Sequence, residues 1–336
     1  MIVRLLKIFG IILLSASVLL LVLFYRQDRS FESLESTYFT TNSHYQDIEI
    51  LALDETPLNL RIHYQDFGSQ DDPVVVLLHG AFASSHTFEP WAMILNDAGY
   101  RVIAIDLPYH GLSDGFEDQV TSQRRSAAVV YALIESLDIS TFFIGGNSMG
   151  GGVSWYFTSV YHTLDSITVQ GLILIDAVPP RTESGGSFTQ SSFLRRPVVS
   201  RIASKMTPKF LLNYILKGVY GSSSVVTDET LTRYYELILK EGFRQGLLTN
   251  MQEDASSETM TQTERLSLIK DLEIPILVMW GAEDTWISVE TVDIFRDLLE
   301  LSDDDIVIYP GIGHVPMEEN PILTSVELIA FLNRNT

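Results

Sequence analysis

A serine stands between two glycines at the end of an apolar run, in the stretch FFIGGNSMGG over residues 142–151. Gly146, Ser148 and Gly150 have the spacing G-x-S-x-G, which is typical of a nucleophile elbow. On such a turn the serine hydroxyl projects beyond the carboxyl end of a strand, and the backbone is so close that only glycine fits at the flanking positions. The competing interpretation is a glycine-rich turn that packs a helix tightly on a strand. The strand–turn–helix context favours Ser148 as a nucleophile.

A serine hydroxyl is a weak nucleophile unless a base accepts its proton. The chain has seven histidines, and His314, in YPGIGHVPMEENP, directly follows the last strand-like run. The other histidines do not follow the last strand-like run and lie in the linker, the hairpin, turns, or predicted helix or loop surface: His44, His63, His79, His86, His110 and His162. Of these, His79 and His110 precede glycines in the turns LHGA and YHGL, where a ring more often braces a loop. His314 is therefore the predicted base.

Two aspartates are candidates for the acid that orients the base. Asp284, in WGAEDTWI, follows the penultimate strand-like run, and Asp176, in LILIDA, ends the run before it. Both stand at carboxyl ends of predicted strands, so either position is compatible with contact to His314. Asp284 is favoured because it lies in a polar, glycine-opened loop beside the histidine loop. Asp176 ends an apolar run, which is more typical of a residue that braces a turn.

An acyl-transfer site also needs two N–H donors for the oxyanion of the intermediate. The elbow supplies one, the backbone N–H of Met149, at the positive end of the following helix. The second is expected from the loop after the run VVVLLHG, in HGAFASS. There Ala81 is the first candidate and Phe82 the second.

These residues come together only if a sheet aligns the strands that precede them. The runs at 46–53 and 58–65 alternate apolar and polar residues around DETP and predict a hairpin with one solvent-exposed face. Six further runs are apolar throughout, as expected of strands covered on both faces: 74–80, 101–108, 141–146, 171–177, 274–281 and 305–311. Helical patterns alternate with them. The predicted fold class is α/β, with a mostly parallel, doubly wound sheet.

The alternation of strand-like and helical runs stops between residues 178 and 270, where no strand-like run occurs. A structureless loop of that length is implausible in a compact domain, and the segment has helical patterns of its own. We therefore expect a core in two parts, residues 46–177 and 271–336, with a helical cap over 178–270 inserted between them.

Residues 1–26 are predicted to be a transmembrane anchor, because the run from Ile8 to Tyr25 is uncharged, apolar and about long enough to span a bilayer. A cleaved signal peptide is the alternative, but its small-residue site would lie inside the run, with leucines after it. Residues 27–45 are polar and are predicted to be a linker. Basic residues flank both ends of the run, so the positive-inside rule barely decides its orientation. The free amino terminus favours an N-terminus inside, and we therefore expect the main domain outside the cytoplasm.

Charge and composition exclude several classes of site. The formal net charge is -21, which makes nucleic-acid binding unfavourable, and the chain has no cysteine for disulfides, thiolate nucleophiles or Cys-based metal sites. The cap segment reverses this charge, with no acidic residue between Glu183 and Asp228. Its basic residues suggest a face that rests on anionic lipid, against the plainer view of a solvated cap: Arg195, Arg196, Arg201, Lys205, Lys209 and Lys217.

Taken in order, LLHGAFASSHTFEPW, DLPYHGLSD, GGNSMGG, WGAEDTWI and GIGHVPMEENP resemble the α/β-hydrolase superfamily over residues 46–336. Within it, the chain resembles bacterial esterases and lipases with a helical cap and an N-terminal membrane segment. The resemblance implies a triad of Ser148, His314 and Asp284, oxyanion donors at Ala81 and Met149, and no cofactor or metal. It implies a small-molecule or lipid ester as substrate and a single-pass protein of the bacterial inner membrane with a periplasmic catalytic domain. Asp106 and His110 match a structural turn of the superfamily.

Other activities of the same superfamily remain open alternatives. Carbon–carbon bond hydrolases carry a similar elbow but usually have a tryptophan soon after the histidine, and none follows His314. Dehalogenases of this fold use an aspartate nucleophile, which Ser148 argues against. A non-catalytic binding module on the same scaffold is a third alternative, and an intact set of Ser148, Asp284 and His314 argues against it.

Overall fold

The computed structural model describes residues 23–51, 56–117, 121–162, 164, 166–180, 204–244 and 260–336, and at the N-terminus residues 4, 7–12, 15 and 19. The predicted anchor over residues 1–26 therefore falls largely outside the described residues. Within the described part, no helix combines the length and apolar character needed to cross a bilayer. Half of the predicted basic cap residues, Arg195, Arg196 and Arg201, also lie outside it.

The strands form one eight-stranded sheet in the order β1-β2-β4-β3-β5-β6-β7-β8. The bounds of these strands are β1 Ser43–Leu51, β2 Pro57–Phe67, β3 Val74–Leu78, β4 Arg101–Ile105, β5 Thr141–Asn147, β6 Thr168–Ile175, β7 Ile276–Gly281 and β8 Ile306–Tyr309. The first two pair antiparallel as a hairpin, and β2 joins β4 antiparallel. All pairs from β4 through β8 are parallel. All eight predicted strands and their mostly parallel arrangement are confirmed.

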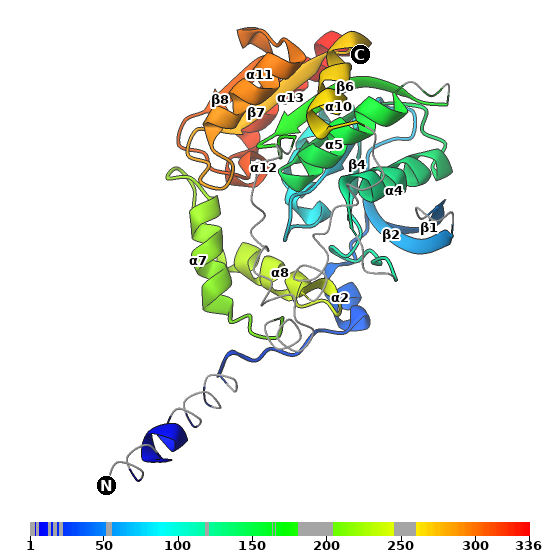
Figure 1. The fold of residues 1–336 in the computed structure, drawn as a ribbon. Helices are drawn as coiled ribbons and strands as arrows, with labels where there is room; N and C mark the ends of the chain where they lie inside the picture. The colour runs from blue at the N-terminus through cyan, green and yellow to red at the C-terminus, as the bar shows by residue number, and fades with distance from the viewer. Residues whose placement is uncertain are drawn as a thin grey trace.

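Two layers of helices sandwich the sheet (Figure 1). Along β3, Val74, Val76 and Leu78 join the core under α4 (Gln123–Ser136), α5 (Met149–Tyr161) and α11 (Val292–Leu299), whereas Val75 and Leu77 join the core on the opposite face. That second core holds side chains of α3 (Glu89–Asp97) and α13 (Pro321–Asn335). Because alternate side chains of a strand point to opposite faces, burial on both faces requires an unbroken apolar run.

The remaining helices are short. They are α2 (Phe31–Tyr38), α7 (Lys209–Val219), α8 (Asp228–Ile238), α10 (Gln262–Ser267) and α12 (Pro316–Glu319), with 3-10 turns η1 (Ser85–Phe88), η3 (Leu268–Leu272), η4 (Val289–Thr291) and η5 (Asp303–Asp305). Between β6 and β7, α7 and α8 lie together at one end of the molecule, close to α2 (Figure 1). These two helices fall within the predicted cap segment, and Pro208 is the N-cap residue of α7.

The linker expected over residues 27–45 is instead folded onto the domain. Helix α2 occupies its centre, and β1 begins at Ser43. Leu34 of α2 is fully buried and packs with Leu112 and Leu237. The segment is polar overall, and Leu34 is the apolar side chain of this two-turn helix that packs on the domain.

Candidate active site

Ser148 stands between β5 and α5 with φ 54° and ψ −117°. Positive φ is strained for a residue with a side chain and persists only where the surroundings fix it. Here the N–H of Ser148 donates to the carbonyl of Ile175 at 2.9 Å, and its carbonyl accepts from Gly152 and Val178. The elbow that the sequence predicted is therefore present, with its serine pinned between β5 and β6.

The two flanking glycines are required by close backbone approach. A Cβ atom on Gly146 would overlap the backbone of Gly150, and one on Gly150 would overlap the carbonyl oxygen of Leu78. Helix α5 therefore starts in direct contact with β5 and β3, and its first turn ends at the serine. This contact explains why an apolar strand breaks into glycines at this point.

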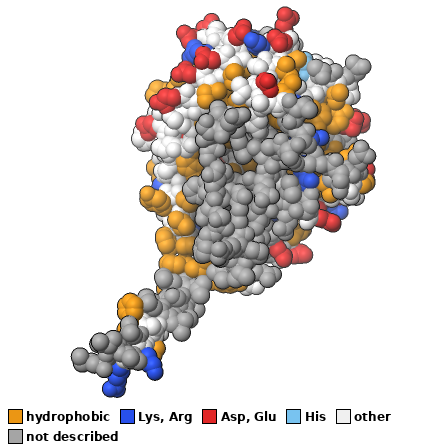
Figure 2. Space-filling view, in the orientation of Figure 1, with side chains coloured by type: hydrophobic (Ala, Val, Ile, Leu, Met, Phe, Trp, Pro, Cys, Tyr) orange, Lys and Arg blue, Asp and Glu red, His pale blue; other side chains and the backbone are white. Residues whose placement is uncertain are grey.

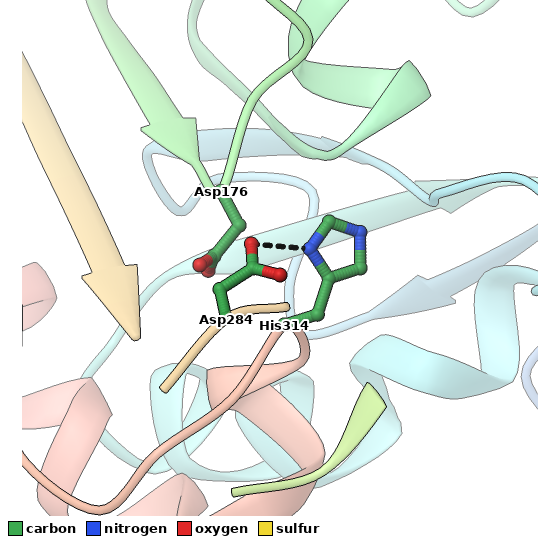
Figure 3. Close-up of side chains that lie close together, drawn as sticks. All are labelled: Asp176, Asp284 and His314. Atoms are coloured by element: carbon green, nitrogen blue, oxygen red, sulfur yellow. Dashed lines mark hydrogen bonds and ion pairs between the residues drawn. The ribbon is translucent and has the colours of Figure 1, made fainter. Parts of the chain in front are cut away.

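His314 follows β8 and is 4% exposed. Its Nδ1 donates to Oδ2 of Asp284 at 2.7 Å (Figure 3). The other carboxylate oxygen of Asp284 accepts from the N–H groups of Trp286 at 2.7 Å and Ile287 at 3.1 Å. The acid is thus fixed by two backbone donors and in turn fixes the ring, which leaves Nε2 as the basic nitrogen.

No hydrogen bond joins Ser148 to the ring of His314, and among the described residues Nε2 has no hydrogen-bond partner. The serine and histidine segments are nevertheless tied, because the side chain of Asn147 donates to the carbonyl of His314 at 2.8 Å. In proteins without substrate, catalytic hydrogen bonds are often long and tighten on binding. The structure brings Asp284 and His314 together and sets the elbow beside them.

Asp176, the alternative acid, is fully buried on the other side of Asp284 (Figure 3). One of its oxygens accepts from the N–H of Gly281 at 2.9 Å. Burial, reinforced by the neighbouring Asp284 carboxylate, raises the pKa of Asp176 well above its usual value. Asp176 therefore braces the end of β7, as its apolar run suggested, and Asp284 is the carboxylate that contacts the ring of His314.

The ligand atoms of Asp176, Asp284 and His314 lie within 4.8 Å of one another, close enough to be considered as a cation site. The 2.7 Å hydrogen bond already occupies Nδ1 of His314 and Oδ2 of Asp284, the inward atoms of that pair. Burial raises the pKa of Asp176 and so disfavours the charged form that would attract a cation. The arrangement therefore fits an acid–base pair better than a metal site.

The predicted oxyanion donors stand after β3 and at the start of α5. Within the described residues, the backbone N–H groups of Ala81 and Met149 have no hydrogen-bond acceptor, and the same holds for Phe82. Ala81 and Phe82 both line the pocket described below. Unpaired N–H groups at a helix start and an adjacent loop are what an oxyanion requires.

Two of the remaining histidines brace turns, as expected. The ring of His79 donates from Nδ1 to the carbonyl of Gly80 at 2.8 Å and accepts at Nε2 from the N–H of Leu107 at 3.1 Å. His110 donates to the carbonyl of Pro108 at 2.9 Å, and burial lowers its pKa to about 3. Asp106 accepts from Ser85 and Leu112 in the same turn region and has no contact with His314.

A pocket of about 100 Å³ opens beside His314. On the core side it is lined by Asn147, His314, Val315 and Trp286. The loop after β3 and the cap helices supply the rest: Gly80, Ala81, Phe82, Ala83, Thr207, Leu211, Leu212, Ile215, Leu216, Val219, Tyr234 and Ile238. Sequence reasoning missed these cap residues, Trp286 and Asn147, because no motif marks a side chain whose role depends on a helix folding back over the sheet.

Comparison with known proteins agrees with this architecture. The α/β-hydrolase fold family matches residues 73–321. A 2-hydroxy-6-oxononadienedioate/2-hydroxy-6-oxononatrienedioate hydrolase of Escherichia coli is 36% identical over 84% of this chain and 95% of its own length.

Solved structures show the same fold at lower identity. A thermophilic esterase from Thermogutta terrifontis is 23% identical, with a TM-score of 0.68 over 87% of this chain and all of its own. A membrane phospholipase A, described as a bacterial virulence factor, is 23% identical, with a TM-score of 0.63 over the full length of both chains. The family match, the sheet order and the serine elbow agree, and the chain belongs to the α/β-hydrolase fold family.

Proposed function

We propose that this protein hydrolyses carboxylic esters through an acyl-enzyme on Ser148. The observation that carries the proposal is the 2.7 Å bond between His314 and Asp284 beside a strained serine elbow. His314 accepts the proton of Ser148 as the hydroxyl attacks the ester carbonyl, and Asp284 stabilises the imidazolium that forms. The N–H groups of Ala81 and Met149 stabilise the oxyanion. His314 then protonates the leaving alcohol and activates the water that releases the acid.

The character of the pocket supports an apolar ester as the substrate. Its described cap wall consists of leucine, isoleucine and valine side chains from α7, Tyr234 and Ile238 from α8, and Thr207, and no lysine or arginine is among the described lining residues. Burying an apolar acyl chain against such a wall is favourable, whereas a carboxylate placed there would lose its hydration without a partner. An ester with an uncharged acyl chain fits these walls best.

Carbon–carbon bond hydrolysis is the second candidate, because relatives 36% identical to this chain are named for it. The substrate in that name is a dioate and carries two carboxylates. A pocket for such a substrate needs cationic partners, which the described lining lacks. The absence of a tryptophan after His314 also argues against carbon–carbon bond hydrolysis.

One experiment separates the two activities and tests the nucleophile. The purified protein is assayed with p-nitrophenyl esters of increasing acyl length and with a 2-hydroxy-6-oxo-dienoate. A fluorophosphonate probe is applied in parallel, and Ser148→Ala is the matched control. We expect ester turnover and labelling in the wild type and neither in Ser148→Ala. Turnover of the dienoate alone would favour the second candidate, and ester turnover by Ser148→Ala would overturn the assignment of the nucleophile.

We also propose that the protein is anchored by residues 1–26 in the bacterial inner membrane, with the catalytic domain on the periplasmic side. The supporting feature is the uncharged apolar run from Ile8 to Tyr25. The test is carbonate extraction of membranes, followed by protease treatment of spheroplasts. Retention in the pellet together with digestion from outside is expected. Release by carbonate would contradict the anchor, and protection from protease would contradict the orientation.

The outer face of α7 is a candidate contact with that membrane. Phe210 and Tyr214 are 63% and 78% exposed, and the ring of Phe210 lies 5.8 Å from that of Phe24. Figure 2 shows hydrophobic side chains gathered where the N-terminal segment meets the body of the protein. An exposed apolar patch continuous with an anchor fits a lipid surface. The inner face of α7 lines the pocket together with His314 and Ala81, so a lipid ester would have a short path to these residues.

The charged residues of the cap support this contact less than the apolar ones. Lys205 pairs with Asp28, and Lys209 donates to Thr232 at 2.9 Å.

A double variant, Phe210→Asp with Tyr214→Asp, is expected to lower turnover of a long-chain ester in vesicles and to spare a soluble short-chain ester. The control is Ile322→Asp, at an exposed position on α13, which should change neither. Equal loss on both substrates would argue against membrane contact.

A further inference from the structure

The turn between α7 and α8, residues 219–224, lies directly against the loop that carries His314. We refer to these residues as the cap turn. The backbone N–H of His314 donates to the carbonyl of Val219 at 2.7 Å. The N–H and hydroxyl of Ser223 both donate to the carbonyl of Gly311, at 3.0 and 2.7 Å. The predicted base is thus hydrogen-bonded through its own backbone to a part of the cap.

A carboxylate joins the same two segments. Glu319, at the end of α12, accepts from the N–H groups of Gly313 at 2.9 Å and Val315 at 3.2 Å, the residues on either side of His314. Its other oxygen accepts from the N–H of Gly221 and the hydroxyl of Ser224, both at 2.7 Å. Hydrogen bonds to a charged acceptor are about twice as strong as neutral ones. Glu319 therefore holds the histidine loop and the cap turn at a fixed separation.

The loop that carries Asp284 is also hydrogen-bonded to the cap turn. Glu283, adjacent to Asp284, accepts from both the N–H and the hydroxyl of Ser222 at 2.7 Å. The N–H of Glu283 donates in turn to the carbonyl of Ile312 at 2.9 Å, in the histidine loop. The loops of Asp284 and His314 and the cap turn form one hydrogen-bonded unit.

Packing at this junction leaves no space for a side chain. A Cβ atom on Gly221 would overlap the backbone of Gly311 and Gly313, and one on Gly313 would overlap the carbonyl of Val219. By contrast, a Cβ on Gly218, near the end of α7, would meet no atom within 4 Å. The backbone of the cap turn therefore touches the backbone of the histidine loop.

The sheet alone does not provide this support. His314 follows β8, which is the edge strand and pairs only with β7. A loop beyond an edge strand has no neighbouring strand end on its outer side to fix it. In this chain the cap turn occupies that side.

We propose that the cap turn positions the base and acid of the active site, with Glu319 and Gly221 as positioning residues. The cap is then part of the catalytic framework as well as a wall of the pocket. Movement of the cap about residues 219–224 would displace His314, so this junction stays closed while substrate enters. The proposal rests on the proposed function for its kinetic readout only.

The first test compares alanine at two nearby glycines of the chain: Gly221, where a Cβ atom has no space, and Gly218, where it meets no other atom. Gly221→Ala is expected to lower kcat for a p-nitrophenyl ester on the order of tenfold to a hundredfold, with KM nearly unchanged, because sub-ångström to ångström displacement of a catalytic group has effects of that size. Gly218→Ala is expected to leave kcat and KM at wild-type values. Wild-type kcat in folded Gly221→Ala, or a change in KM alone, would overturn the proposal.

The second test uses Glu319→Gln, which keeps the side-chain shape but turns an amide group toward backbone N–H donors. We expect a lower kcat and a shifted acidic limb of the pH profile of kcat/KM, because the ring of His314 moves relative to Asp284. Glu300→Gln, on an exposed carboxylate paired with Lys270, is the control for loss of charge. If Gly221→Ala does not fold, Glu319→Gln decides alone, and a wild-type kcat and pH profile would overturn the proposal.

A measurement without substrate separates this proposal from the proposed function. The proton shared by His314 and Asp284 gives a low-field NMR resonance, which is expected to shift or disappear in Gly221→Ala and Glu319→Gln and to persist in Gly218→Ala. This result would stand even if the wild type hydrolysed no ester. An unchanged resonance in folded Glu319→Gln would overturn the positioning role whatever the substrate.

Discussion

The side chain of Asn147 donates a hydrogen bond to the backbone carbonyl of His314 at 2.8 Å, across 167 residues of sequence. The same amide also donates to the carbonyl of Ile175 at 3.3 Å. Asn147 immediately precedes Ser148 and is 1% exposed. A single buried amide therefore ties the elbow to the loop of the base and sets how near the two reactive groups can stand.

Replacing Asn147 by alanine is expected to leave two buried carbonyls without this donor. We expect a loss of about 1–3 kcal/mol in the free energy of unfolding, the usual cost of an unsatisfied buried polar group. We also expect kcat for esters to fall on the order of tenfold, because the histidine loop loses its link to the elbow. Urea unfolding and steady-state kinetics measure the two effects.

The control for Asn147→Ala is Ser154→Ala in α5, which removes a bond from the Ser154 hydroxyl to the carbonyl of Gly150 at 2.8 Å. Ser154 is fully buried but does not contact the histidine loop. Its loss should lower stability with little change in kcat. Equal kcat losses in both variants would mean that Asn147 acts through stability alone.

Asp284→Asn is expected to reduce kcat by roughly 10³- to 10⁴-fold while the protein stays folded, as for comparable changes in other serine hydrolases. The amide presents a donor to Nδ1 of His314 and so favours the tautomer whose Nε2 carries the proton. Such a ring has no free nitrogen toward Ser148. Single-turnover labelling with a fluorophosphonate gives the rate, and circular dichroism checks the fold. A rate within tenfold of wild type would show that another group orients the base.

Asp176→Asn should behave differently, because burial and the neighbouring Asp284 raise the pKa of the Asp176 carboxyl and disfavour its charged form. A carboxyl with a raised pKa binds its proton more tightly in the folded protein than in the unfolded chain. Its contribution to stability is complete below the unfolded pKa of about 3.9 and is lost as the pH rises toward the folded pKa. Asparagine has no such loss, so the variant should gain stability relative to wild type between pH 5 and pH 8.

Urea unfolding of both proteins at those two pH values measures this difference, and we expect ester turnover by Asp176→Asn within about threefold of wild type at pH 7. The acceptor for the N–H of Gly281 is retained in the variant. A variant that loses stability relative to wild type as the pH rises would contradict a raised pKa of Asp176.

Leu34→Ala is expected to cost about 2–4 kcal/mol of unfolding free energy, because the side chain is fully buried between Leu112 and Leu237. The control is Leu51→Ala at the end of β1, where leucine is 62% exposed and the cost should stay under about 0.5 kcal/mol. Thermal and urea unfolding measure both. A negligible effect at Leu34 would mean that α2 is not part of the cooperative domain.

Much of the fold was predictable from local patterns. The six continuous apolar runs are strands because burial on both sheet faces allows no polar residue, and the alternating runs form the hairpin at the sheet edge. The elbow was predictable for a steric reason, since Gly146 and Gly150 are the residues that close backbone contact permits. The order of these elements also brought Asp284 and His314 to neighbouring strand ends.

The linker and the pocket were harder to predict, for a common reason. Leu34 in a polar segment carries no periodic signal strong enough to show that the helix docks. Trp286, Tyr234 and the α7 side chains line the pocket only because the cap folds back over the sheet. Contacts between segments far apart in sequence leave no local pattern.

The sequence by itself determined the strands, the elbow and the candidates for acid and base, because each depends on residue types within a few positions. Only the tertiary structure decided which aspartate pairs with His314, since Asp176 and Asp284 both end strands and differ by where their oxygens point. It alone showed that Asn147 and the cap turn hold the histidine loop. Those bonds join segments about 90 to 170 residues apart, and a chain reveals such pairs only when it is folded.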